Sequence, residues 1–165
     1  MRASGFTLVE ILIVVLILGI LAMIAVPEFT SAVQDTKESA ALQNQQMVQK
    51  QIGLYKLEHT GRSPHLDENG VADTNNFVPR LTGRSDPSGG VNPSGTCGPY
   101  LTSWPANPLA DPPRAADVQF GTLPNGGGKT GWYFNTVTHE FIANDAISIE
   151  KRVAEIASQL TPSGG

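Results

Sequence analysis

Residues 5–27 read GFTLVEILIVVLILGILAMIAVP, and the hydropathy of this segment decides how the rest of the chain must be placed. Between residues 6 and 26 the strongly polar side chains are those of Thr7 and Glu10 alone. As a helix with a rise of about 1.5 Å per residue, this run reaches about 31 Å, which matches the hydrocarbon core of a bilayer. The sequence therefore predicts one membrane-spanning helix near the N-terminus.

Glu10 is the residue that a plain membrane anchor does not explain. A carboxylate inside a bilayer costs about 2.5 kcal/mol or more, and such groups usually face a partner. If the chain is cut after Gly5, the new amine of Phe6 lies four residues before Glu10, on the same face of a helix. In an ordered bundle, the amine of a neighbouring chain offers the same charge. The sequence alone leaves both partners open.

The N-terminal residues resemble a known export signal. A short basic leader, Gly5, Phe6 and then Thr-Leu-Val-Glu ahead of an apolar run are similar to the class III signal of type IV pilins and type II secretion pseudopilins. The resemblance implies that a prepilin peptidase cuts between Gly5 and Phe6 on the cytoplasmic side and methylates the new N-terminus of Phe6. It divides the chain into a cleaved leader (1–5), a transmembrane and polymerisation helix (6–27) and a periplasmic pilin-like domain (28–165).

The same resemblance implies a set of partners and a location. The protein is expected to be a homo-oligomer in a helical filament, to contact other pseudopilins or pilins, and to be handled by an inner-membrane assembly platform. Before assembly it would span the bacterial inner membrane once. Arg2 and the lack of acidic residues in the leader favour a cytoplasmic N-terminus and a periplasmic C-terminal domain.

Two plainer interpretations compete for the N-terminal segment. An ordinary secretory signal would use Arg2 as its basic region, but the apolar run at residues 11–26 exceeds the usual ~7 to 15 residues, and no A-x-A cleavage site follows it. A simple single-pass anchor explains the length, but it leaves the Gly5-Phe6 pair and Glu10 without a role.

The helix is expected to continue beyond the membrane. Gly19 and Pro27 weaken it, and Pro27 removes the backbone donor to Met23, so a kink is expected near Pro27. The resemblance adds that the segment between Gly19 and Pro27 can lose helical order inside a filament. Residues 28–59 then place apolar side chains at helical spacing, which predicts an amphipathic helix that covers a sheet. This stripe comprises Phe29, Val33, Ala40, Met47, Val48, Ile52 and Tyr55, while Gln45 and other polar residues are assigned to other faces.

The C-terminal part predicts a small sheet with long loops. Gly61 as C-cap and Pro64 beyond it end the helix. Residues 118–120, 131–134 and 140–143 predict short strands, the last two paired as a hairpin. The expected fold class is therefore α+β, with a long N-terminal helix packed on a small antiparallel β-sheet. Residues 149–160 predict a short helix that packs on the sheet or on a neighbouring molecule.

Two further passages resemble major pseudopilins. They are residues 55–64 at the helix exit and residues 98–108, where Asn107 stands in place of the usual acid. Tyr100, Leu101 and Trp104 are expected to pin the second passage onto the helix. Many type IV pilins close a C-terminal loop with a cysteine pair, whereas Cys97 is the sole cysteine here. This departure favours a pseudopilin, with Cys97 interpreted as an inert or partly buried thiol.

Candidate sites for chemistry are sparse. One Cys, three scattered His and no paired acids in a recognisable setting do not predict an enzyme. Asp67, Asn69 and Asp73 are weak candidates for calcium, but their loop fails the EF-hand template, so a solvated turn is expected. His59 and His65 have no partner at ligand spacing, and both are interpreted as surface residues rather than zinc ligands.

The overall charge and one glycine-rich segment exclude two further function classes. The formal net charge is −4, and no nucleic-acid surface is expected. The segment PNGGGKT (124–130) ends like a phosphate-binding loop, but Leu123 stands where such a loop requires Gly. The expected function is a structural subunit of a type II secretion pseudopilus that supports export of folded proteins. A type IV pilin for adhesion, motility or DNA uptake and a membrane-tethered periplasmic binding module remain alternatives.

Overall fold

The computed structural model describes residues 6–122, 130–145 and 149–150 of the 165-residue chain. Its elements are listed here in chain order: α1 (Leu8–Glu58), η1 (Thr74–Asn76), α2 (Phe77–Thr82), η2 (Arg114–Ala116), β1 (Val118–Gly121), β2 (Trp132–Asn135) and β3 (Phe141–Ala143). The chain divides into two compact units, residues 1–38 and 39–165. Most of the helix expected at residues 149–160 lies outside the described residues, as does Gly5 of the leader.

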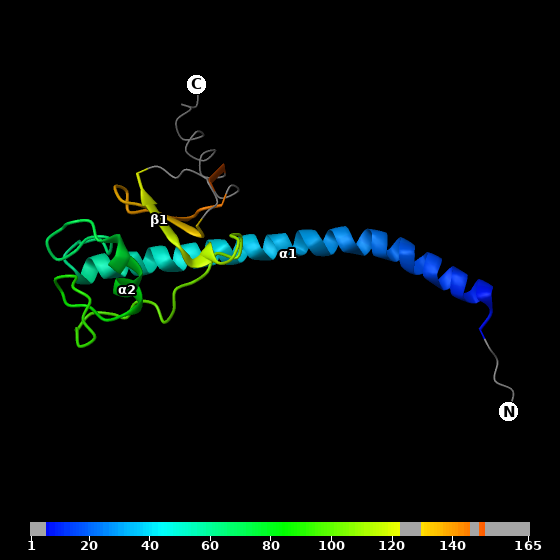
Figure 1. Cartoon of the computed structure of the whole chain (residues 1–165), viewed down its shortest axis with the longest axis horizontal. Coiled ribbons are helices and arrows are strands. Elements are labelled where there is room, and N and C mark those ends of the chain that lie inside the picture. The colour runs from blue at the N-terminus through cyan, green and yellow to red at the C-terminus, as the bar shows by residue number, and fades with distance from the viewer. Residues whose placement is uncertain (1–5, 123–129, 146–148, 151–165) are drawn as a thin grey trace, which may run out of the picture. The chain divides into compact units, whose positions relative to one another are not determined.

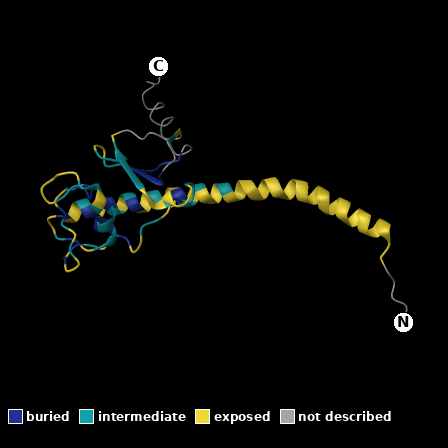
Figure 2. Ribbon diagram, in the orientation of Figure 1, coloured by how far each residue is buried: buried dark blue, intermediate teal, exposed yellow. Residues whose placement is uncertain are grey.

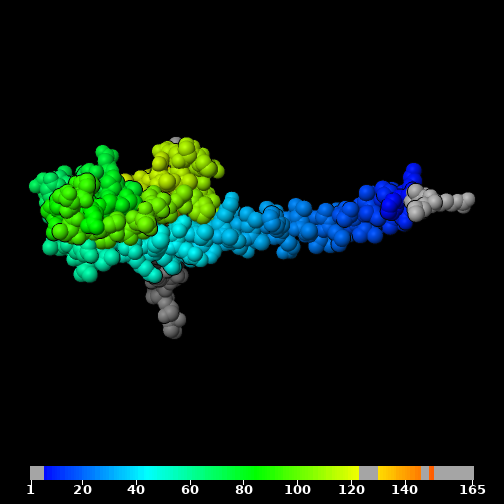
Figure 3. Space-filling model, turned by 90° about the horizontal axis from the view of Figure 1, so that it is seen from below, coloured from blue at the N-terminus to red at the C-terminus, as the bar shows by residue number. Residues whose placement is uncertain are grey.

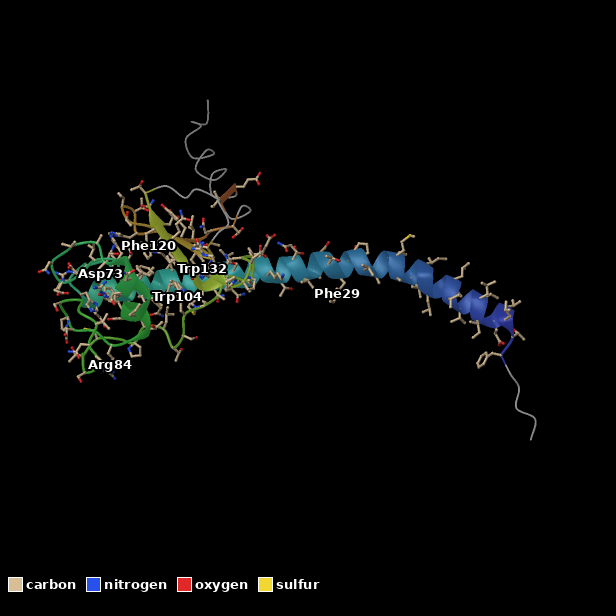
Figure 4. All side chains as sticks on the ribbon, viewed as in Figure 1. Phe29, Asp73, Arg84, Trp104, Phe120 and Trp132 are labelled. Carbon is tan, nitrogen blue, oxygen red and sulfur yellow. The ribbon has the colours of Figure 1, made fainter. Side chains whose placement is uncertain are left out.

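The first unit holds the N-terminal part of α1. Within α1, an 18-residue window with a mean hydropathy of 3.1 is long and apolar enough to cross a membrane, and no part of that window is buried by the protein. All residues from 6 to 33 are exposed (Figure 2). Phe29, for example, projects from the helix with 73% of its surface exposed (Figure 4). The expected long apolar helix is present, whereas the assignment of Phe29 and Val33 to the core stripe is wrong.

In the second unit, the C-terminal part of α1 carries a narrow buried face. Ala41, Val48, Ile52 and Tyr55 are buried, at intervals of seven, four and three residues that keep them on one side of the helix. The stripe is therefore confirmed at Val48, Ile52 and Tyr55. Met47, which is 38% exposed, does not belong to it, and Ala41 is the buried alanine instead of Ala40.

Aromatic rings form the opposite side of the core. Phe77, Trp132, Phe134 and Phe141 are almost fully buried and belong to one cluster with Ile52 and its neighbours. The ring centroids of Phe77 and Phe134 lie 4.8 Å apart, and those of Trp132 and Phe141 lie 5.1 Å apart. Such pairs contribute about 0.5–1.5 kcal/mol each beyond the burial of their area. The α+β class expected from the sequence is confirmed, because a long helix packs on a small sheet (Figure 1).

The sheet itself is mixed. Its order is β1-β2-β3, with β2 and β3 antiparallel as expected and β1 and β2 parallel. The expectation of an entirely antiparallel sheet is therefore wrong at β1. A tight hairpin can join only antiparallel strands, as at residues 136–140, but the longer connection between Gly121 and Trp132 lets the chain return to the same end of the sheet before β2 begins.

Two glutamines of α1 bind the outer edge of β3. The side-chain oxygen of Gln49 accepts a hydrogen bond from the Phe141 amide (2.7 Å), and that of Gln45 accepts one from the Ala143 amide (3.0 Å). The Gln49 amide nitrogen also donates to the His139 carbonyl (3.2 Å). The sequence analysis assigned Gln45 to a face of the helix outside the core stripe, whereas the structure places its side-chain oxygen on β3. Unpaired strand edges are templates for aggregation, and here the covering helix satisfies one of them.

The end of α1 lies where the sequence places it. The Gly61 amide donates to the Lys56 carbonyl (2.7 Å), which is the long bond of a Schellman cap. The left-handed conformation begins one residue earlier than expected, at Thr60 with φ of 55°, and continues at Gly61 with φ of 84°.

The passage at residues 98–108 packs against the rest of the second unit. Leu101 is buried in the core, and the Tyr100 hydroxyl donates to a Glu58 carboxylate oxygen of α1 at 2.6 Å. Trp104 contacts the rings of Phe77 and Phe141 and packs on the core cluster that includes the buried face of α1. Figure 4 shows Trp104 and Trp132 within the same packed region of this unit. The expected pinning onto the helix is thus confirmed for Tyr100 and Leu101.

Replacing Gln49 with Ala should lower the free energy of unfolding of the second unit by about 1–3 kcal/mol, because the Phe141 amide loses its acceptor. Urea unfolding of the full chain in detergent micelles, followed by tryptophan fluorescence, measures this change. Gln46→Ala is the matched control, because Gln46 is exposed on the same helix. Equal losses from both variants would contradict the role given to Gln49.

Candidate functional site

The start of α1 brings together two of the residues that the sequence singles out. The Glu10 carboxylate accepts hydrogen bonds from the Thr7 amide (3.2 Å) and the Thr7 hydroxyl (3.3 Å), while the Glu10 amide donates to the Thr7 hydroxyl oxygen (3.2 Å). Since α1 begins at Leu8, Thr7 is the N-cap and Glu10 the third helical residue. This reciprocal arrangement is a capping box, which satisfies two backbone donors that a helix start would otherwise leave free.

The capping box gives Glu10 a role that the sequence analysis missed. The signal was available, because Thr-x-x-Glu directly before an apolar run is the sequence pattern of a capping box. A carboxylate in the first turn also interacts favourably with the positive end of the helix dipole. Part of the cost of Glu10 in a membrane is therefore offset within one chain. Its net negative charge is still uncompensated by any cation among the described residues.

Phe6 precedes the capping box and is 81% exposed. In the full-length chain it carries a peptide bond and no free amine, so it cannot neutralise Glu10. Gly5, the other half of the expected cleavage site, lies outside the described residues. The roles of Gly5 and Phe6 in cleavage and methylation stay predictions.

Gly19 and Pro27 both lie inside α1, whose helical assignment continues across them. A Cβ atom added at Gly19 would meet nothing within 4 Å. Just after Pro27, the Thr30 hydroxyl donates to the Val26 carbonyl (2.8 Å), and the Ser31 hydroxyl donates to the Pro27 carbonyl (3.2 Å). Bonds of this kind tend to bend helices. The expected kink near Pro27 and loss of helical order in a filament remain predictions.

The residues considered for calcium already have protein partners. Asp67 accepts hydrogen bonds from the Val71 and Asn69 amides at 2.8 and 2.9 Å, and these bonds lower the pKa of its carboxyl group. The Asp73 carboxylate binds Arg80 and Asn76, both at 2.8 Å. Across the described parts of the chain, no group of three or more His, Cys, Asp or Glu side chains is placed to hold a metal ion.

A buried arginine takes the central place in this loop region. Arg80 is 2% exposed and donates to the carbonyl oxygens of Gly89, Pro64 and Asp73 at 2.8, 3.1 and 3.2 Å. With the Asp73 carboxylate, the guanidinium therefore faces four oxygen atoms from three separate loop segments. The hydrogen bond from Asn76 and then the charge of Arg80 lower the pKa of Asp73. The pair stabilises the loops because every nitrogen of the guanidinium donates at least one hydrogen bond.

His59 is buried, which corrects its interpretation as a surface residue. Its ring stacks on Tyr55 at 3.8 Å, one ring nitrogen lies 2.8 Å from the Tyr55 carbonyl, and the other lies 3.0 Å from the Ser85 hydroxyl. A Ser–His contact is the core of many hydrolase sites. Here Ser85 and His59 are both 0% exposed, so no substrate can reach them, and the pair belongs to the core.

His65 is also buried instead of lying on the surface. Its ring lies 5.4 Å from that of His139, whose Nδ1 is 3.1 Å from the Lys56 ammonium. Burial, followed by the neighbouring His139 and then by Arg80 and Lys56, lowers the pKa of His65 to about 4. Burial and Lys56 lower the pKa of His139 as well. This cluster is therefore neutral at both imidazoles when the protein is folded at neutral pH.

Cys97 is a free and buried thiol, as the sequence analysis interpreted it. Its backbone pairs with Ser85 through two hydrogen bonds of 3.0 and 3.1 Å, which close the long loop that follows α2. Backbone pairing thus closes a loop here without a disulfide.

Comparisons with known proteins agree with this arrangement. Residues 1–26 match the family described as the prokaryotic N-terminal methylation motif. A type II secretion system core protein G from Pseudomonas aeruginosa is 33% identical over 111 residues, which cover 67% of this chain and 71% of that protein. Competence protein ComGC from Bacillus subtilis is 39% identical over 66 residues, which cover 40% of this chain and 67% of that protein. No solved structure matches the chain.

A hydrophobic N-terminal helix that carries this motif and continues into a small α+β domain defines a pilin-like structural subunit. The chain belongs to the type IV pilin-like family with the N-terminal methylation motif, and it is homologous to type II secretion core protein G and to ComGC. Proteins of this family are filament subunits rather than enzymes.

Acid should destabilise the second unit between about pH 6.5 and pH 4. An imidazole whose pKa is lowered by folding binds protons more readily in the unfolded chain, so the free energy of unfolding falls as the pH drops through this window. The fall due to His65 should reach about 3 kcal/mol. Urea unfolding at a series of pH values measures this fall. In the His65→Asn variant, the slope of the unfolding free energy against pH should decrease to the contribution of His139. An unchanged slope would contradict the assignment.

Proposed function

We propose that this chain is a subunit of a type II secretion pseudopilus that supports the export of folded proteins. The observation that carries the proposal is how far the similarity extends. Two matches to core protein G cover 67% and 74% of this chain and a third covers 36%, whereas three matches to ComGC and its homologue cover 39% to 41%. Because every pilin-like protein shares the N-terminal helix, similarity that continues into the C-terminal domain is the more discriminating kind.

A competence or other type IV pilus subunit is the second candidate. Two of the ComGC matches, at 37% and 39%, are higher in identity than the core protein G matches at 29% to 34%, while a third ComGC match is 31% identical. The absence of a cysteine pair and the packed passage at residues 98–108 favour the pseudopilin, since the sequence of that passage resembles major pseudopilins. A membrane-tethered periplasmic binding module would use the same anchor but would leave Gly5-Phe6 uncut.

The exposed part of α1 supplies the driving force for assembly. Its Leu, Ile and Val side chains between residues 8 and 26 are each at least half exposed, and Figure 3 shows this stretch in blue. Each such side chain gains about 1.5–3 kcal/mol on leaving water. A subunit that leaves the bilayer must therefore bury this helix against the helices of other subunits. This burial would drive polymerisation through residues 6–27.

Glu10 would set the register between subunits in this mechanism. After cleavage, the Phe6 amine provides the cation that the full-length chain lacks. Pairing that amine with Glu10 in the same or a neighbouring subunit removes an unpaired charge from an apolar environment, and this is possible at only a few axial offsets. The prepilin peptidase and the inner-membrane assembly platform are the partners that this route requires.

Glu10→Leu should increase the amount of protein in the membrane fraction, because it removes the energetic cost of a carboxylate in the bilayer. It should also decrease the yield of filaments, because it removes the negative charge that pairs with the Phe6 amine. The capping box allows a sharper comparison. Glu10→Gln keeps a side-chain oxygen for the Thr7 amide but removes the charge, and Thr7→Val keeps the charge but removes the cap hydroxyl. Filament yield should fall for Glu10→Gln and persist for Thr7→Val. The reverse pattern would make Glu10 a capping residue alone.

Deleting the gene should abolish the secretion of folded enzymes and leave surface fibres and DNA uptake intact. Enzyme activity in the medium, electron microscopy of fibres and transformation frequency measure the three processes in one strain. Complementation with the parent chain should restore secretion. The Gly5→Leu variant should not restore secretion, because a side chain beside the scissile bond blocks cleavage. Mass spectrometry should therefore find the Phe6 N-terminus in the parent chain and not in this variant. Loss of DNA uptake with normal secretion would favour the competence pilus.

A further inference from the structure

The sheet has a second edge, on β1, which no described segment covers. In the parallel pair, the Trp132 amide donates to the Asp117 carbonyl (3.0 Å) and the Thr136 amide donates to the Gly121 carbonyl (2.9 Å). A parallel ladder uses alternate residues of each strand, so Gln119 and Gly121 face β2. The peptide groups of Val118 and Phe120 therefore point outward, away from the sheet.

A groove runs along this outer edge. It has a volume of about 370 Å³. Its lining residues come from β1 (Val118, Phe120), from the η1–α2 segment (Thr74, Asn75, Val78), from the segment of residues 114–117 around η2, and from Thr130. Val78, Val118 and Phe120 pack on the core but remain only partly buried. The groove thus combines partly exposed apolar side chains with unpaired backbone groups. Both features call for a covering segment.

The residue directly after β3 is hydrogen-bonded to Thr130, which lines this groove. The Asn144 side-chain amide donates to Gln119 of β1 (3.1 Å) and to the hydroxyl of Thr130 (2.7 Å), and Thr130 itself lines the groove. The side-chain oxygen of Asn144 is buried without a hydrogen-bond donor among the described residues. The Ile149 amide then donates to the Asp145 carbonyl (3.1 Å), so the last described residues stay close to the end of β3.

We propose that residues 149–160 of the same chain form the covering segment and dock along the groove beside β1. Fifteen residues follow Glu150, which is enough chain to span a strand of four residues. Ile149, Val153, Ile156 and Leu160 share one helical face, and this face matches the apolar side chains of the groove. Both edges of the sheet are then covered by helical segments, β3 by α1 and β1 by the C-terminal segment. This inference does not depend on which filament the subunit builds.

Amide hydrogen exchange at single-residue resolution tests the docking in the full chain in detergent micelles. Ending the chain after Glu150 should speed exchange at Val118 and Phe120 by about tenfold or more, while Gln119 and Gly121 keep their protection through β2. Ile156→Asp should have the same effect. Ser158→Asp is the matched control, because Ser158 lies on the opposite helical face, and it should change nothing. Unchanged exchange at Val118 and Phe120, or equal effects of the two Asp variants, would overturn the proposal.

Disulfide capture gives an independent answer if a truncated chain fails to fold. In a Cys97→Ser background, Asn75→Cys on the groove wall should form an intramolecular disulfide with Ile156→Cys. Ser94→Cys, on the exposed loop beside Arg84, should not form one with Ile156→Cys. Figure 4 shows Arg84 and Phe120 in different regions of the unit. Disulfide-linked dimers in place of the intramolecular product would mean that a second copy fills the groove, and would overturn the assignment.

Discussion

The contact between the buried face of α1 and the aromatic face of the sheet is the interaction on which the second unit depends. Val48, Ile52 and Tyr55 supply one side, and rings such as Trp132 and Phe141 supply the other. The strands have only three or four residues each, too few to form a stable sheet by themselves. Burial of the rings on α1 therefore holds the strands together, and Gln45 and Gln49 fix their register through the edge of β3.

The same helix has two different environments along its length, and this division underlies the function. Its N-terminal part exposes apolar side chains in every direction, so that part is suited to lipid or to other helices of the same kind. Its C-terminal part has one narrow buried face, and the rest of its surface mixes polar side chains with a few apolar ones such as Leu42 and Leu57. One continuous element can then anchor the precursor, carry the assembly contacts and organise the domain. Glu10 stands at the start of this element, where its charge and its capping bonds act together.

The loops of the second unit are held by buried side-chain and backbone hydrogen bonds. Arg80 provides a fixed internal cation for oxygen atoms of three loop segments, and the backbone of Ser85 pairs with that of Cys97. A guanidinium is permanently charged and offers five donors in a rigid plane, so it can organise carbonyl groups much as a bound ion would. Asn107 has a related role, because its side chain binds the Gly131 carbonyl at 2.7 Å.

The sequence by itself determined the features that depend on local composition. The membrane-spanning helix, its continuation through Tyr55, its end near Gly61 and the three strands all follow from hydropathy, periodicity and turn residues within short windows. The Thr7–Glu10 capping box was equally local and could have been predicted. Tertiary structure decided what depends on residues far apart in the chain. The parallel pairing of β1, the burial of His59, His65 and Arg80, and the bonds from Gln45 and Gln49 to β3 all depend on which segments meet in space. Polar residues look alike in sequence whether they face water or a buried partner, because only the partner's position decides which environment they occupy.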